Sequence, residues 1–185
     1  SDVVVITSGI TRKPGMTRDD LIATNAKIVK SVTEQVIEHS PDAIIIIVSN
    51  PLDVMTYAAY LTAKKPASKV FGMAGILDTA RYRAFLATEL DCSPKDIQAV
   101  LMGGHGDTMV PLPRYTTVGG IPVTDLLPME RIDEIVERTK KGGGEIVNLL
   151  GTSAWYAPGA AVSGLVQAIA CDQQKMFACS TLLEG

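Results

Sequence analysis

Two short aliphatic runs in the first part of the chain predict buried strands. The runs cover residues 3–7 and 43–49, and each ends at a Ser-Gly or Asn-Pro pair typical of turns. Strands that are apolar at every position are buried on both faces, as in a parallel sheet covered by helices. Between the runs, residues 17–40 carry apolar side chains at helical spacing. The pattern therefore predicts a β-α-β unit with a right-handed crossover.

The start of this helix carries a capping signal. Thr17 is followed three residues later by Asp20, an acidic residue at the capping-box position, and Pro41 follows the last periodic residues.

The elements predicted downstream are a helix over 51–64 with Pro51 at its first position, a strand over 69–73, a helix over 78–90, a strand over 97–102, a hairpin of 114–118 and 121–123 around Gly119-Gly120, a helix over 130–150 interrupted by glycines 142–144, and a helix over 159–174.

The change in pattern near residue 75 predicts a boundary between two domains. Residues 1–75 have the character of a parallel α/β sheet, while residues 76–185 mix helices with antiparallel strands. We expect the second half of a Rossmann-type sheet followed by a mixed α+β domain. No G-x-G-x-x-G follows a strand, so a pyrophosphate-binding turn is expected to lie outside this sequence. Both ends look like the interior of a fold.

Composition and charge narrow the function classes. Hydrophobic residues make up 46% of the 185 residues and charged residues 20%, which excludes a disordered tail. A net charge of −3 and a pI near 5.4 argue against a nucleic-acid or anionic-membrane partner. The longest apolar stretch, residues 43–48, is far too short to span a bilayer.

The cysteines and histidines argue against a metal site. Three cysteines, at 92, 171 and 179, have no metal-ligand spacing, and the chain has two histidines. We interpret the cysteines as reduced thiols of a cytoplasmic protein, and we predict no metal.

His105 is the first candidate for chemistry. It stands in Gly103-Gly104-His105-Gly106-Asp107, beyond an apolar strand, where glycines leave the imidazole unshielded. A lone histidine is more often structural than catalytic. Asp78 and Arg81 share one helix face, which by itself indicates a weak surface ion pair. If His105 lay nearby, Asp78 would instead fix its tautomer, and Arg81 would hold a carboxylate.

A cationic loop follows the first strand. Arg12, Lys13 and Arg18 crowd a helix N-terminus, where solvated surface charge is one interpretation and an anion site is the other. Pro14-Gly15 suggests that this loop moves over a ligand. Asn50 follows the second buried strand, and it is either a simple helix N-cap or part of a ligand crevice at the carboxyl ends of the sheet.

The order and spacing of these motifs resemble the malate/lactate dehydrogenase family, most closely its bacterial lactate-dehydrogenase-like malate branch. The matching segments are Arg12-Lys13-Pro14-Gly15-Met16-Thr17-Arg18, Ser49-Asn50-Pro51-Leu52-Asp53, Gly72-Met73-Ala74-Gly75-Ile76-Leu77-Asp78-Thr79-Ala80-Arg81 and Gly103-Gly104-His105-Gly106-Asp107. The resemblance covers essentially the whole chain, which looks like the middle of a family member. It implies that residues 1–75 are the C-terminal part of an NAD-binding domain and that residues 76–185 are a truncated substrate domain.

The resemblance also implies roles for individual residues. His105 would be the acid/base in hydride transfer, Asp78 would orient it, and Arg18 would polarise the substrate oxygen. The implied substrate-binding residues are Arg12, Arg18, Asn50 and Arg81, and the implied cofactor-binding residues are Thr7, Gly9, Asn25, Val48, Ser49 and Asn50, with NAD as cofactor.

The resemblance makes Arg12 the residue that selects the substrate. An arginine here is typical of the malate enzymes and glutamine of the lactate enzymes, because a desolvated cation prefers a dicarboxylate. We therefore expect oxidation of (S)-malate to oxaloacetate by a homotetramer or homodimer. The alternatives are a lactate or other 2-hydroxy-acid dehydrogenase, or a non-catalytic fragment that binds carboxylates. The isolated chain is expected to be inactive.

Overall fold

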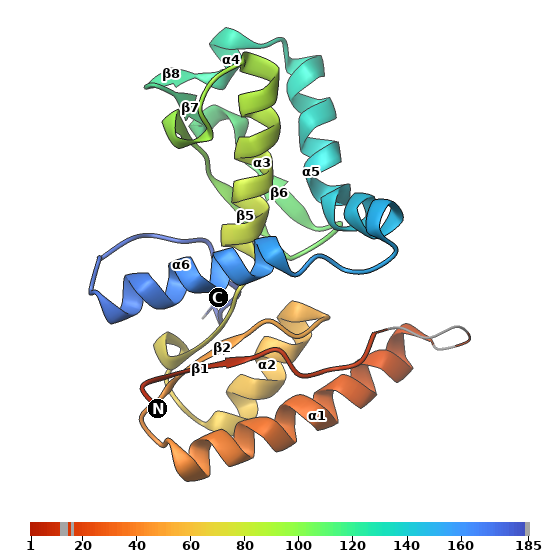
Figure 1. Ribbon diagram of the computed structural model, residues 1–185, viewed down its shortest axis with the longest axis vertical. Helices are drawn as coiled ribbons and strands as arrows, with labels where there is room; N and C mark the ends of the chain where they lie inside the picture. The colour runs from red at the N-terminus through yellow and green to blue at the C-terminus, as the bar shows by residue number, and fades with distance from the viewer. Residues whose placement is uncertain (12–14, 16, 184–185) are drawn as a thin grey trace. The chain divides into compact units, whose positions relative to one another are not determined.

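The computed structural model describes residues 1–11, 15 and 17–183, without the side chain of Arg18. The chain divides into two compact units (Figure 1). The first consists of Ser1–Ala74 and the segment that begins at Cys179, and the second is Gly75–Ala178. Within the described residues, no helix combines the length and the apolar character that crossing a membrane requires.

The first unit is built on a parallel sheet. Strands β1 (Val3–Ile6), β2 (Ile44–Ile47) and β3 (Val70–Gly72) pair in the order β1-β2-β3. The connections are α1 (Arg18–His39) and α2 (Leu52–Ala63), and a 3-10 turn, Ala67–Lys69, precedes β3. Parallel neighbours joined by helical crossovers confirm the predicted Rossmann-type β-α-β arrangement.

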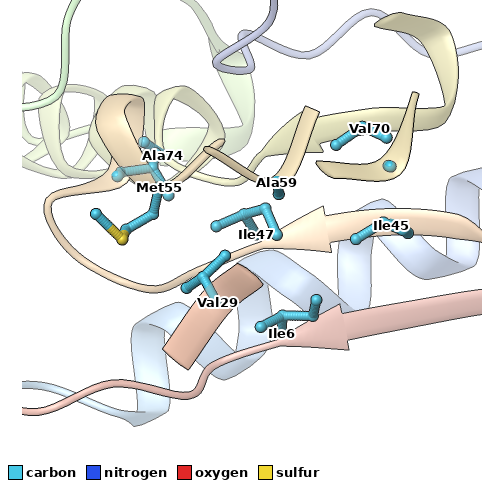
Figure 2. Close-up of a cluster of buried hydrophobic side chains, with 10 residues drawn as sticks. Ile6, Val29, Ile45, Ile47, Met55, Ala59, Val70 and Ala74 are labelled. Atoms are coloured by element: carbon cyan, nitrogen blue, oxygen red, sulfur yellow. The ribbon is translucent and has the colours of Figure 1, made fainter. Parts of the chain in front are cut away.

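The core of this unit lies between the sheet and the two helices. Figure 2 shows Ile47 of β2 beside Val29 of α1 and Ala59 of α2, and Ile45 of β2 and Met55 of α2 belong to the same cluster. All five side chains are fully buried. The burial of these side chains stabilises this unit. Because β1 and β2 are parallel neighbours, their carboxyl ends lie at the same edge of the sheet.

The predicted capping box at the start of α1 is present. Thr17 Oγ1 accepts from the backbone N–H of Asp20 at 3.1 Å, and Asp20 Oδ2 accepts from the N–H of Thr17 at 3.1 Å. The hydrogen bonds from Thr17 also lower the pKa of the Asp20 carboxyl group. The cap fixes where the loop after β1 joins α1.

The second unit packs helices against small antiparallel sheets. Its helices are α3 (Gly75–Leu90), α4 (Val123–Leu126), α5 (Met129–Leu150) and α6 (Tyr156–Ala170), with 3-10 turns at Pro94–Asp96 and Pro113–Tyr115. Its strands are β4 (Ile97–Gln98), β5 (Leu101–Gly103), β6 (Met109–Pro111), β7 (Thr117–Val118) and β8 (Ile121–Pro122). The strands form the sheets β4-β7-β8 and β5-β6. The core includes Tyr82 and Leu86 of α3 and Ile132 and Ile135 of α5.

Several sequence-based boundaries are wrong in this unit. The strand predicted over 97–102 is two strands, β4 and β5, in different sheets. The hairpin β5–β6 was not predicted, because β6 is three residues long and ends in a proline, which is unfavourable inside a sheet. Residues 114–115 lie in a 3-10 turn, although the hairpin β7–β8 around Gly119-Gly120 is present.

The predicted helices also differ from the structure, and the helix predicted over 159–174 is α6, which covers Tyr156–Ala170. The long helix α5 continues through the glycines at 142–144, because packing against α3 outweighs their low helix propensity. Helix α3 begins three residues before the predicted start, at Gly75. Pro51 is the N-cap residue of α2 and not its first helical residue, which is Leu52.

Candidate functional site

The side chains of His105 and Asp78 meet within the second unit. His105 lies between β5 and β6, whose hairpin brings it beside the first turns of α3. The Nδ1 atom of His105 is 2.7 Å from Oδ2 of Asp78. A carboxylate can only accept a hydrogen bond, so Nδ1 carries the proton and donates it. This contact fixes both the tautomer and the orientation of the ring.

Asp78 also holds Arg81. Its second oxygen, Oδ1, accepts from Nη1 of Arg81 at 3.1 Å, across one turn of α3. The Asp78 side chain is 2% exposed, whereas His105 is 24% exposed. One buried carboxylate therefore orients two side chains, and the imidazole is the more accessible of them. The interpretation of Asp78 and Arg81 as an isolated surface pair is wrong.

A glycine of α5 shapes the space around Arg81. A Cβ atom added to Gly142 would lie 3.2 Å from Cδ of Arg81 and 3.7 Å from Nε. Gly142 is buried, and Nε of Arg81 is buried without a hydrogen-bond partner among the described residues. The side chain of Arg81 therefore lies close to the backbone of α5. Sequence reasoning missed Gly142, although an unexplained glycine inside a long helix was the available signal.

The polar residues of the first unit gather where β1 and β2 end. Ser49 Oγ donates to the carbonyl oxygen of Ser8 at 2.6 Å. The buried side chain of Asn25 bonds to the backbone of Ile10 and of Asn50. The other predicted cofactor residues here are Thr7, Gly9 and Val48, of which Thr7 and Gly9 are exposed and Val48 is half-buried. Ligands of open α/β sheets bind at this edge.

Two predicted site residues have no described side-chain geometry. Arg12 lies outside the described residues, and Arg18 is the first residue of α1 with its side chain undescribed. Among the described residues, no three histidine, cysteine or acidic side chains are grouped so that they could hold a metal ion.

Comparison with known families accounts for both units. Residues 1–72 match the family described as lactate/malate dehydrogenase, NAD binding domain. Residues 76–185 match the family described as lactate/malate dehydrogenase, alpha/beta C-terminal domain. The chain belongs to the lactate/malate dehydrogenase family.

Individual relatives place the chain within this dehydrogenase family. A malate dehydrogenase from Cytophaga hutchinsonii is 69% identical over all 185 residues, which cover 59% of that protein. The structure of malate dehydrogenase from Salinibacter ruber is 59% identical with a TM-score of 0.94, and the chain covers 58% of it. The structure of lactate dehydrogenase from Eimeria maxima with NADH and oxamate is 42% identical with a TM-score of 0.94 and is also covered to 58%. The chain thus spans somewhat more than half the length of these relatives.

Proposed function

We propose that this chain carries the catalytic groups of an NAD-dependent malate dehydrogenase, which interconverts (S)-malate and oxaloacetate. The observation that carries the proposal is the buried Asp78 carboxylate, bonded to His105 at 2.7 Å and to Arg81 at 3.1 Å. A protein that only bound carboxylates would need Arg81 but not a histidine oriented by an aspartate. The 69% identity to a malate dehydrogenase supports the same activity.

The three side chains divide the proton chemistry and the binding between them. His105 takes the hydroxyl proton of malate on Nε2, because Nδ1 already donates to Asp78. The Asp78 carboxylate stabilises the positive charge that this transfer places on the ring. Arg81 grips the carboxylate next to the reacting carbon with two parallel hydrogen bonds.

The residues of the cationic loop and of the first unit complete the proposal by family resemblance. Arg18 polarises the substrate oxygen, Arg12 pairs with the distal carboxylate, and Asn50 contacts the substrate. Thr7, Gly9, Val48, Ser49 and Asn50 form the cofactor side, and the buried Asn25 bonds to the backbone of Ile10 and Asn50 beside them. The exposed Thr7, Gly9 and Asn50 lie at the carboxyl edge of β1 and β2, where open α/β sheets bind nucleotides. When bound, NAD would supply the acceptor for the hydride of the substrate carbon.

We also propose the predicted organisation of the protein. Residues 1–75 belong to the NAD-binding domain and residues 76–185 to the substrate domain, in a cytoplasmic homotetramer or homodimer. Light scattering after size-exclusion chromatography measures the oligomeric state directly.

The activity can be tested with two forms of the protein. One is the 185-residue chain, and the other is a full-length chimera in which this chain replaces the matching segment of the C. hutchinsonii malate dehydrogenase. We expect the chimera to oxidise NADH with oxaloacetate far faster than with pyruvate. A chimera that folds but reduces neither acid, while the chain still binds oxaloacetate, would establish the carboxylate-binding alternative.

Arg12→Gln tests the substrate. Removing the cation from a pair with the distal carboxylate leaves that carboxylate without its partner, whereas pyruvate loses nothing. We expect the ratio of kcat/KM for oxaloacetate over pyruvate to fall by at least about tenfold in the chimera. Lys13→Gln, which removes the neighbouring cation, is the matched control. Equal ratios in Arg12→Gln and the unchanged chimera would contradict the assignment to malate and favour a lactate-type enzyme.

Gly142→Ala tests the packing of Arg81. The added methyl group would press on Cδ of Arg81 at 3.2 Å, so we expect the KM for oxaloacetate to rise by about three- to tenfold in the chimera. Gly143→Ala is the control, because a Cβ there meets no described atom within 4 Å. Alanine favours the helix at both positions, so a KM change common to both variants would rule out the contact with Arg81 as its cause.

A further inference from the structure

The side chain of Asn25 is occupied by the backbone of two loops. It lies on α1, and the residue is 1% exposed. Its Oδ1 accepts from the N–H of Ile10 at 2.8 Å, and its Nδ2 donates to the carbonyl oxygens of Ile10 at 3.2 Å and of Asn50 at 2.7 Å. A primary amide has two N–H donors. Both donors and the oxygen are therefore engaged with backbone atoms.

These bonds join the two loops at the carboxyl edge of the sheet. Ile10 lies in the loop between β1 and α1, which also carries Arg12. Asn50 lies between β2 and α2, and it is exposed. The amide of Asn25 thus bonds to Ile10 at both its N–H and its carbonyl, as a neighbouring strand would, and holds the carbonyl of Asn50 with the same nitrogen.

Gly9 gives this contact its close fit. A Cβ atom added at Gly9 would lie 3.3 Å from Cγ, Oδ1 and Nδ2 of Asn25. Such a contact is tighter than ordinary van der Waals packing, so a larger residue would push the amide away from its partners. The absence of a side chain at Gly9 thus favours the position of the amide.

We propose that Asn25 is a positioning residue that clamps the Ile10 and Asn50 loops together and acts on substrate and cofactor only through them. The buried amide has almost no surface left for a ligand, whereas the Asn50 backbone that it holds carries an exposed side chain. The inference rests on the proposed function, which places substrate at Asn50 and Arg12.

Hydrogen exchange in the 185-residue chain without ligands tests the clamp. We expect Asn25→Ala to speed exchange of the Ile10 amide by about ten- to a hundredfold, measured by NMR, because a buried hydrogen bond is lost. Asn25→Asp should keep this amide protected, since a carboxylate oxygen still accepts from it. The control is Thr33→Val on the same helix, which removes a buried hydroxyl that has no hydrogen-bond partner among the described residues. It should leave the Ile10 amide unchanged.

Kinetics in the chimera separate positioning from direct contact. Both Asn25→Ala and Asn25→Asp lose the donor to the Asn50 carbonyl, so both should raise the KM for oxaloacetate by about tenfold. Gly9→Ala should raise it in the same direction. Unchanged Ile10 exchange in Asn25→Ala would overturn the proposal. Weaker NADH binding in that same variant would then indicate a direct contact between Asn25 and the cofactor. A chimera without dehydrogenase activity would remove the proposed function, while the exchange result would still decide whether the clamp exists.

Discussion

Replacing His105 by alanine is expected to lower turnover with oxaloacetate by about 10²–10⁴-fold, the usual contribution of a positioned acid or base. The imidazole is held at Nδ1 by Asp78, so its other nitrogen is presented in one fixed orientation for proton transfer. The loss should appear in kcat, because the carboxylate-binding Arg81 keeps its bond to Asp78 when the ring is removed. Steady-state rates of the chimera at saturating oxaloacetate measure it.

The other histidine of the sequence provides the matched control. His39 is the last residue of α1 and is exposed, so His39→Ala should leave kcat within about twofold of the unchanged chimera. Thermal unfolding of both variants shows whether the fold is retained. A His105→Ala chimera that turns over at a near-normal rate would remove His105 from the mechanism.

The parallel sheet could be predicted from sequence because its signals are local. The apolar runs give β1 and β2 within one or two residues, and Thr17 with Asp20 gives the N-cap of α1. The second unit was less predictable because its strands are two or three residues long, too short for an alternating pattern to be recognised. Their pairing depends on contacts that are distant in sequence.

The same distinction applies to the site. The chain order of Asp78, Arg81 and His105 pointed to a shared site only through family resemblance, because spacing cannot show that residues 27 positions apart touch. The roles of Gly142 and of the Asn25 amide depend on which backbone lies against each side chain. A glycine within a helix gives the same sequence signal whether or not a side chain packs against it. An asparagine on a buried helix face likewise gives the same signal whether it bonds to backbone or to a ligand.

Asp78→Asn is expected to lower kcat/KM for oxaloacetate by about 10²–10⁴-fold while changing no volume. The two carboxylate oxygens accept from His105 Nδ1 and from Arg81 Nη1, and an amide has only one oxygen. If the new NH₂ group faces Arg81, two donors oppose each other in a buried site, and the guanidinium loses its orientation. If it faces His105, Nδ1 must accept the amide N–H, and the ring proton then lies on Nε2.

These two arrangements have different kinetic consequences, so the variant shows which partner depends more on the charge. A wrong histidine tautomer removes the proton acceptor and lowers kcat, and the ¹⁵N chemical shifts of the His105 ring would show the proton on Nε2. A displaced Arg81 weakens the grip on the carboxylate and raises KM. Asp107→Asn, the same change at an exposed residue two positions beyond His105, should alter neither. Normal kcat and KM in Asp78→Asn would contradict a role for the carboxylate charge, and His105 would then be oriented by shape alone.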